Sequence, residues 1–371
     1  MTEKKKGSVV PYRVLFIVIV SVIVVISIIL ILTARTEEPV PVKAGCLFSG
    51  SISEEGWIRS NFEGLSEACA QNGVKLEVKE NVAENEADCI SAVNELAAEG
   101  CTVIFLPGSE YIQFLDRLSD LFRGVRFYTG GVSKEDDLSA FCSGRMYQVR
   151  YLSGIIAGLT TKSNVVGYVA AKHDNEVIRG INAFTLGAQS INPYVSVKVI
   201  FTGSWDDAQA ETAAVHRLAE LSADVIAYHQ DRENVPRACE EEGIDFIGTY
   251  KLGGSYSEHC LTSMVCSWDK IYGAVLRDVM SRRAGGGMTY WLGIENGTVS
   301  LAKYSENVSN RARYEVMFAV NRMEAGRSIF SGEIYDTDGV LRCAQGEVLS
   351  DRTLLLGMDW FVQGVEAVED K

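Results

Sequence analysis

A buried strand followed by an amphipathic helix is the pattern that most constrains how this chain can fold. Residues 165–171 are apolar throughout, which is typical of a strand buried on both faces of a parallel sheet. The polar segment 172–175 follows, and then apolar residues recur at helical spacing over 177–188, with Asp174 or Asn175 as the expected N-cap. Because open parallel sheets bind ligands beyond the carboxyl ends of their strands, we expect functional residues just after residue 171.

The same strand–helix unit recurs along the chain at intervals of about 25–30 residues. The first series of expected strands is 45–48, 75–79, 101–106 and 125–128, with helices at 58–69, 87–98 and 111–122. The second series of expected strands is 165–171, 195–201, 225–228, 246–249 and 261–265, with helices at 151–159, 208–221, 235–242 and 268–281. This alternation predicts an α/β fold with parallel sheets and right-handed crossovers, arranged as two lobes with a cleft between them.

The C-terminal part has a different pattern. Residues 291–301 and 334–342 contain Asn-Gly and Asp-Gly dipeptides between short apolar segments, which are typical of β-hairpins. Helices are expected at 310–325 and 358–368.

Residues 14–32 form a long apolar run in which Ser21 and Ser27 are the only polar side chains. A helix of this length can cross the roughly 30 Å hydrocarbon core of a bilayer. Three lysines precede the run, which predicts a cytoplasmic N-terminus. We therefore expect a cytoplasmic tail at 1–13, a transmembrane signal anchor at 14–33 and a linker at 34–43.

The remaining residues, 44–371, are then expected to form an extracytoplasmic domain at the cell membrane. Its first lobe would cover about 44–160 plus a C-terminal segment, and its second lobe about 161–290. A cleaved signal peptide is one alternative, although the run is longer than usual and no A-x-A site follows. A lipoprotein modified at Cys46 is another, although Lys43-Ala44-Gly45 is a poor lipobox.

Charge and cysteine content exclude some classes of function. The net charge is −14, or about −18 when residues 1–36 are set aside, and such acidity argues against a nucleic-acid partner. Nine cysteines could form up to four disulfides or remain buried thiols, and the sequence does not choose between these. Four histidines without CxxC or HxxxH spacing make a structural metal site unexpected, and no cofactor is expected.

Aromatic and polar side chains follow several of the expected strands. Trp57 comes after the Gly50–Gly56 loop, and Trp205 follows the strand at 195–201. Two tryptophans at equivalent strand ends in two lobes would face each other across a cleft and could stack on a flat ligand. His229 and Asp231 follow the strand at 225–228 and could form hydrogen bonds with polar groups at the edge of a ligand.

Other interpretations of these segments are weaker. The Gly50–Gly56 loop lacks a phosphate-binding pattern, and Glu54 and Glu55 would repel phosphate. A hydrolase triad would need a nucleophilic serine, but no GxSxG is present. Trp57 could be a packed core residue, and Asp206 or Asp207 could simply be an N-cap. No catalytic residue is expected.

These segments resemble the basic-membrane-protein family of solute-binding proteins, which serve ABC transporters for purine nucleosides and bases. The resemblance covers about 44–368 and is strongest in four stretches: 165–193, GSISEEGW near the start, GSWDDAQAE, and GEVLSD with MDWFVQGV at the end. It implies a type I periplasmic-binding-protein fold, in which two Rossmann-like lobes close over one ligand.

The resemblance also implies where a ligand would bind. Trp57 and Trp205 stand where the family places rings around the purine. The other positions carried over are Ser49, Ser53, Ser109, Tyr147, Gln148, Glu176, Arg179, His229, Asp231 and Tyr250.

Some positions depart from nucleoside-binding relatives. The loop after the first strand lacks their Asp-Lys-Ser-Phe-Asn type sequence, Cys266 replaces a lysine that reads the sugar, and Leu252 replaces an aspartate. The resemblance thus favours a free base or another flat heterocycle, delivered to ABC permease subunits by a receptor that the N-terminal helix holds at the membrane. The alternatives are a sensory or regulatory surface protein of the same fold and, more remotely, an enzyme.

Overall fold

The computed structural model describes residues 12–33, 41–132, 141–250, 257–281 and 289–368. The chain divides into two compact units, Met1–Val40 and Pro41–Lys371, which are described separately.

The first unit contains helix α1 (Tyr12–Thr33), which coincides with the predicted anchor. The side chains of residues 27–33, most of the predicted tail and most of the predicted linker lie outside the described residues. Among what is described, no helix is both long and apolar enough to cross a membrane.

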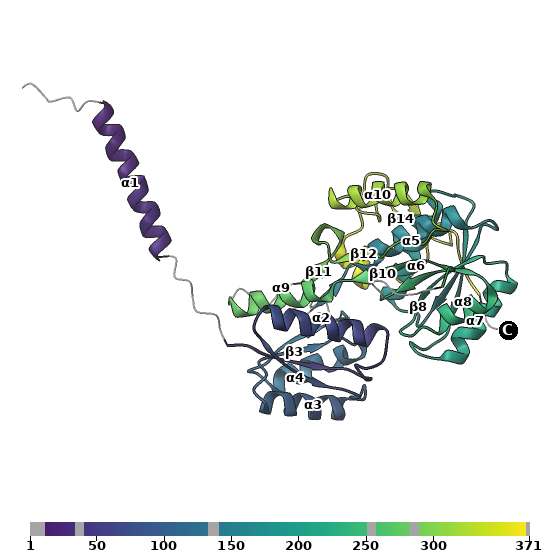
Figure 1. Ribbon diagram of the computed structural model, residues 1–371, viewed down its shortest axis with the longest axis horizontal. Coiled ribbons are helices and arrows are strands. Elements are labelled where there is room, and N and C mark those ends of the chain that lie inside the picture. Colours follow the sequence, from purple (N-terminus) through teal and green to yellow (C-terminus); the bar gives the residue numbers. More distant parts are fainter. Residues whose placement is uncertain (1–11, 34–40, 133–140, 251–256, 282–288, 369–371) are drawn as a thin grey trace, which may run out of the picture. The chain divides into compact units, whose positions relative to one another are not determined.

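The second unit begins with a four-stranded parallel sheet in the order β2-β1-β3-β4. Its strands are β1 (Lys43–Leu47), β2 (Lys75–Lys79), β3 (Val103–Leu106) and β4 (Arg126–Thr129). Its helical segments are α2 (Trp57–Gln71), α3 (Glu86–Ala98), the 3₁₀ turn η1 (Ser109–Phe114) and α4 (Leu115–Leu121). Figure 1 shows α3 and α4 on one face of this sheet and α2 on the other. We call this part the first lobe.

The second lobe is built on a seven-stranded sheet in the order β12-β10-β9-β8-β6-β7-β15. Its strands are β6 (Val165–Ala170), β7 (Ser196–Phe201), β8 (Val225–His229), β9 (Asp245–Thr249), β10 (Cys260–Cys266), β12 (Val299–Leu301) and β15 (Val365–Ala367). All pair in parallel except β12, which is antiparallel to β10. Its helices are α5 (Met146–Thr160), α6 (Asn175–Gln189), α7 (Ala208–Glu220), α8 (Asn234–Glu242) and α10 (Asn310–Glu324).

Three segments carry the chain between the lobes. After β5 (Cys142–Gly144) the chain enters α5, which packs against α6. After β10 it returns as α9 (Trp268–Met280), which packs against α2 in the first lobe. It then passes through β11 (Tyr290–Leu292), which pairs with β5, and the 3₁₀ turn η2 (Ile294–Asn296) to reach β12.

The central strand–helix unit forms as its sequence predicts. Strand β6 is buried along nearly its whole length. Asp174 caps α6, because its carboxylate accepts a hydrogen bond from the backbone N–H of Val177 at 2.9 Å. The parallel sheets and two lobes confirm the α/β periplasmic-binding-protein-like fold class.

Two predictions near the lobe connections and the C-terminus are wrong, and one prediction in the first lobe, the helix at 111–122, is confirmed in part by α4. Residues 291–301 do not form a hairpin, because β11 pairs with β5 and β12 pairs with β10. The expected helix at 111–122 begins as the 3₁₀ turn η1. The expected helix at 358–368 is instead an irregular segment ending in β15, which completes the second sheet, and the helix nearby is α11 (Asp351–Leu356). The remaining pair, β13 (Ile334–Tyr335) and β14 (Leu341–Cys343), is the expected hairpin.

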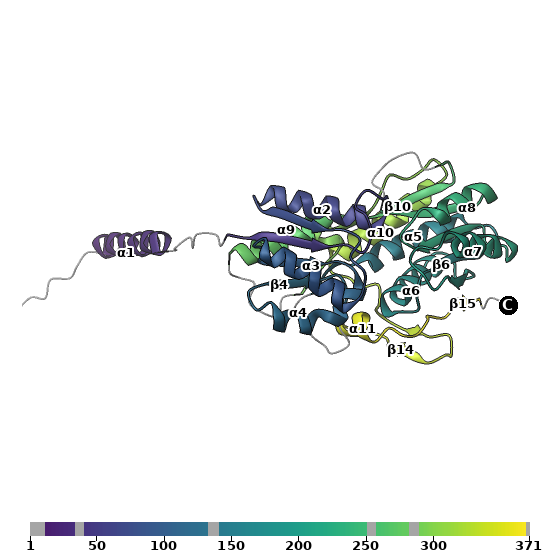
Figure 2. The same cartoon turned by 90° about the horizontal axis from the view of Figure 1, so that it is seen from below.

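The C-terminal segment lies against the second lobe. Figure 2 shows it in yellow, with α11 and β14 on the side of α6. Asn182 of α6 donates to the carbonyl oxygen of Trp360 at 2.8 Å and accepts from the N–H of Val362 at 2.9 Å. These bonds pair two backbone groups of a segment that has no helical hydrogen bonds of its own, and they hold that segment against α6.

All nine cysteines are free thiols, and all nine are buried. The possibility of disulfides that the sequence left open is therefore not realised in this structure.

Candidate functional site

A cleft lies where the carboxyl ends of the strands of both sheets meet, which is the expected binding position in open parallel sheets. It has a volume of about 90 Å³, counted as space open to the centres of water molecules. One water needs about 10–15 Å³, so the cleft holds several waters that a ligand could displace. Its walls are formed by Ser49, Trp57, Asn61, Glu84, Pro107, Gly108, Ser109, Glu110, Gly130, Cys142, Ser143, Met146, Arg150, Glu176, Trp205, His229, Asp231, Tyr250, Trp268 and Tyr272.

Three tryptophans line this cleft. Trp57 is the first residue of α2, Trp268 is the first residue of α9, and their rings meet edge to face at 6.5 Å. Trp205 follows β7 in the second lobe, and its ring meets the His229 ring edge to face at 5.4 Å. The cleft therefore has partly exposed indole rings on both lobes, each held by another ring.

Two nitrogen-bearing side chains lie deep in the cleft. Arg150 of α5 is only 2% exposed, and its Nη1 donates to the Tyr168 hydroxyl at 2.6 Å and to the Tyr228 carbonyl oxygen at 3.1 Å. His229 at the end of β8 is also buried, and among the described residues its Nδ1 has no hydrogen-bond partner. Burial, reinforced by the charges of Arg150 and Arg179, lowers the pKa of His229 well below its usual value. The imidazole is therefore neutral at physiological pH.

Carboxyl groups line the same cleft. Burial, together with the neighbouring Asp206 carboxylate, raises the pKa of Asp231 to about 7. The Glu176 side chain is exposed to the water of the cleft, yet enough protein surrounds it that desolvation raises its pKa as well, against the pull of Arg179. On the first lobe, desolvation and the nearby Glu110 raise the pKa of Glu84. The cleft thus offers carboxyl groups as hydrogen-bond acceptors, and surrounding protein limits the access of water to them.

Eight of the twelve predicted site residues lie together in this cleft. They are Ser49, Trp57, Ser109, Glu176, Trp205, His229, Asp231 and Tyr250. The other four, Ser53, Tyr147, Gln148 and Arg179, do not line it.

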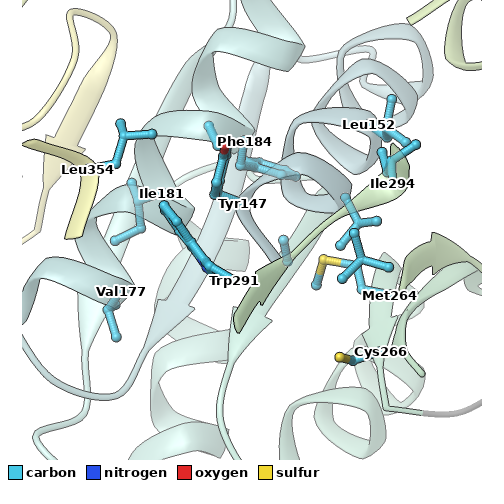
Figure 3. Packing of buried hydrophobic residues seen from close by; sticks show 14 of the residues in the cluster. Tyr147, Leu152, Val177, Ile181, Phe184, Met264, Cys266, Trp291, Ile294 and Leu354 are labelled. Carbon is cyan, nitrogen blue, oxygen red and sulfur yellow. The ribbon is translucent and has the colours of Figure 1, made fainter. Parts of the chain in front are cut away.

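Those four side chains have partners elsewhere. Tyr147 packs against Trp291 and Phe330, with ring centroids 5.4 and 5.6 Å away, and Figure 3 shows it beside Trp291 in the core. Gln148 accepts a hydrogen bond from the N–H of Ile294 at 2.8 Å.

Arg179 donates to the Leu354 carbonyl oxygen at 2.8 Å and lies over the Trp291 ring. It therefore fixes the C-terminal segment. The Ser53 hydroxyl is within 2.9 Å of the Ser51 hydroxyl on the exposed first loop. Of the positions that depart from nucleoside-binding relatives, Cys266 is buried at the end of β10, and Leu252 lies outside the described residues.

Sequence reasoning missed several residues of the cleft, notably Arg150 and Trp268. Trp268 comes two residues after the end of β10 and begins α9, just as Trp57 begins α2. The rule that selected Trp57 and Trp205, a tryptophan just beyond a strand end, would therefore also have selected Trp268. Arg150 gave a weaker signal, namely a charged residue inside the otherwise apolar helix 146–160.

The two lobes touch at the rim of the cleft. Lys172 of the second lobe pairs with Glu110 of the first at 2.5 Å, and Arg232 of the second pairs with Glu54 of the first. Gly56 approaches the second lobe so closely that a Cβ there would lie 2.0 Å from the Asp231 carbonyl oxygen. The structure is therefore a closed arrangement. Within the described residues, no group of three or more His, Cys, Asp or Glu side chains could hold a metal ion.

Comparison with known families agrees with this geometry. A sequence profile described as Bmp, ABC transporter substrate-binding protein PnrA-like, matches residues 41–336. The chain belongs to the PnrA-like family. PnrA-like proteins are substrate-binding proteins and not enzymes, and they bind small molecules and permease subunits.

Individual relatives of this PnrA-like chain carry different names. A purine-binding protein of Brucella abortus is 30% identical over 90% of the chain and 95% of its own length. The transcriptional activator protein Med of Bacillus subtilis is 25% identical over 71% of the chain and 82% of its own length.

Solved structures show the fold of the PnrA-like chain. An ABC transporter solute-binding protein from Aeropyrum pernix covers 77% of the chain and 92% of its own length, with a TM-score of 0.65 and 16% identity. A transcriptional activator of the comK gene from Bacillus halodurans covers 77% and 99%, with a TM-score of 0.63 and 22% identity.

Proposed function

We propose that this protein is the receptor of an ABC importer and binds a purine base, or a similar flat heterocycle, between Trp57 and Trp205. The observation that carries the proposal is that these two rings line one cleft from opposite lobes, together with the polar side chains of His229 and Asp231. Indole rings on both walls suit a flat, polar-edged ligand better than a peptide. The purine-binding relative from Brucella abortus supports the same ligand class.

A free base is proposed ahead of a nucleoside. Cys266 stands where nucleoside-binding relatives have a lysine, and this buried thiol cannot donate to sugar hydroxyls as an ammonium group does.

Calorimetric titration of the full-length protein in detergent with purine bases and nucleosides tests this proposal. Because stacking on one aromatic ring contributes about 1–3 kcal/mol per base, Trp205→Ala should weaken base binding by roughly 5- to 150-fold. Tyr194→Ala is the matched control, since Tyr194 is an aromatic residue that is 82% exposed and does not line the cleft. If neither bases nor nucleosides bind to folded, ligand-free protein, the purine proposal is wrong.

We further propose that residues 14–32 anchor the protein in the cell membrane, with the binding unit outside the cytoplasm. The support is the sequence itself, in which only Ser21 and Ser27 interrupt the apolar run and lysines precede it. The protein should stay in the membrane pellet after an alkaline carbonate wash. Replacing Val20 and Val24 with lysine should release it, because each central charge costs about 2.5–3.5 kcal/mol on insertion scales. Release of the unchanged protein by the wash would contradict the anchor.

A regulatory role is the second candidate. It is favoured by the relatives from Bacillus subtilis and Bacillus halodurans whose names describe transcriptional activators. Crosslinking in native membranes separates the two roles. An importer receptor should be captured with permease subunits in a ligand-dependent way, whereas a regulatory protein should not.

A further inference from the structure

Arg150 is a buried cation without a carboxylate partner. It is 2% exposed, it lines the cleft, and no Asp or Glu oxygen of the described residues lies within 4 Å of its guanidinium. Arg145, on the same segment, instead forms a two-point contact with Asp351 at 2.8 and 2.5 Å. An arginine so deeply buried normally has an anionic or acceptor-rich partner.

The existing contacts use only part of this guanidinium. A guanidinium has five N–H donors. Within the part of the chain that the structure describes, the Arg150 guanidinium makes two hydrogen bonds, both from Nη1, to the Tyr168 hydroxyl and the Tyr228 carbonyl oxygen. These two bonds fix the orientation of the planar group. Within the described residues, Nε and Nη2 make no hydrogen bond, and Arg150 lines the cleft in which a ligand would bind.

Groups of the opposite kind lie in the same cleft. The Glu176 carboxylate is close enough for its charge to interact with that of Arg150, and the charge of Glu176 also acts on Asp231, which lines the same cleft. Neutral His229 has an unpartnered Nδ1. A ligand that satisfies this wall must present acceptors to the arginine and an N–H donor to a carboxylate.

We propose that Arg150 makes the site selective for 6-oxopurines, such as hypoxanthine and guanine, over adenine; this inference rests on the proposed purine-binding function. A 6-oxopurine presents the adjacent acceptors O6 and N7, which an arginine binds with two parallel hydrogen bonds. Its N1–H can donate to the carboxylate of Glu176 or Asp231. Adenine presents an amino group in place of O6, so two donors would face each other, and its N1 carries no hydrogen.

Hypoxanthine and adenine differ at C6 and in the N1 proton, so they form a matched pair of ligands. The full-length protein in detergent should bind hypoxanthine about 5- to 150-fold more tightly than adenine, the discrimination expected of one bidentate arginine contact. 7-Deazahypoxanthine, which has C–H in place of N7, should bind at least several-fold more weakly than hypoxanthine. These ligand comparisons need no variant, so they decide the matter even if changes at residue 150 impair folding.

Arg150→Lys keeps the charge but loses the planar fork. It should reduce the preference for hypoxanthine over adenine to within about threefold, whereas Arg311→Lys on the exposed face of α10 should leave the preference unchanged.

Equal or tighter binding of adenine by the wild-type protein would overturn the role of Arg150 and leave the proposed purine receptor intact. A full preference for hypoxanthine in folded Arg150→Lys would also overturn it. Failure of every purine to bind would overturn both proposals together.

Discussion

Asp231 is the residue at which ligand recognition and stability are most directly connected. Its carboxyl lies in the cleft, and burial together with Asp206 raises its pKa to about 7. An aspartate in an unfolded chain has a pKa of about 3.9. The folded state therefore binds more protons than the unfolded state between about pH 4 and 7, and stability falls as the pH rises through this interval.

Asp231→Asn should remove this loss of folding stability at high pH. We expect the variant to be more stable than wild type by about 1–2 kcal/mol at pH 8, a value reduced from the full shift because the group is partly exposed. At pH 4.5 the difference should be several-fold smaller, since the wild-type carboxyl is then protonated in the folded state. Urea unfolding at both pH values measures this.

Asp338→Asn is the control for this prediction, because Asp338 lies exposed in the turn between β13 and β14. An equal gain for Asp231→Asn at both pH values would contradict the assigned titration.

Individual elements were predictable where a local pattern sufficed. The apolar run at 165–171 predicts strand β6, and Asp174 after it predicts the N-terminus of α6. The parallel topology then predicts that a ligand binds at the carboxyl ends of the strands. Tyr147, Gln148 and Arg179 could not be placed in the same way. Their partners Trp291, Ile294 and Leu354 lie more than a hundred residues away in the chain, and no local spacing encodes that distance. The strands β11 and β15 escaped prediction for the same reason.

The pairing of α5 with α6 is a further element-scale feature that depends on distant contacts. These helices pack through glycines, and a Cβ at Gly154 would lie 2.0 Å from the Phe184 carbonyl oxygen. In an isolated helix, Gly→Ala would stabilise by about 1 kcal/mol. Here we expect Gly154→Ala to lower the free energy of unfolding by about 1–3 kcal/mol, because the helices must separate.

Urea unfolding measures this effect, with Gly273→Ala in α9 as the matched control. A Cβ at Gly273 would lie 3.0 Å from the flexible guanidinium of Arg277 and 3.8 Å from the Asn72 side-chain amide, and it would meet no backbone atom within 4 Å among its three nearest neighbours. That variant should therefore be as stable as wild type or slightly more stable. Equal behaviour of the two variants would mean that the close packing of α5 and α6 contributes little.

At the scale of the whole binding unit, the lobes are held together at the rim of the cleft by exposed charges. Glu54 pairs with Arg232, and Glu110 pairs with Lys172, each across the two lobes. Exposed ion pairs contribute about 0.2–1 kcal/mol each, so Glu54→Gln should speed purine release about two- to fivefold, and the effect should shrink at high salt.

Stopped-flow tryptophan fluorescence can follow this release. Glu220→Gln is the control, because Glu220 pairs with Arg217 within α7 and not across the lobes. An unchanged release rate for the double variant Glu54→Gln/Glu110→Gln would show that these pairs do not hold the cleft closed.

The nine buried thiols have a practical consequence for measuring the opening and closing of the two lobes. Desolvation raises the pKa of the Cys142 thiol to about 12, and every other cysteine is likewise inside the protein. Maleimide reagents need an accessible thiolate, so the native chain should label slowly while folded. Cysteines introduced on the two rims, for example in place of Ser53 and Ser204, would then accept a pair of fluorophores without first removing any natural cysteine. Energy transfer between them would report opening and closing in single molecules.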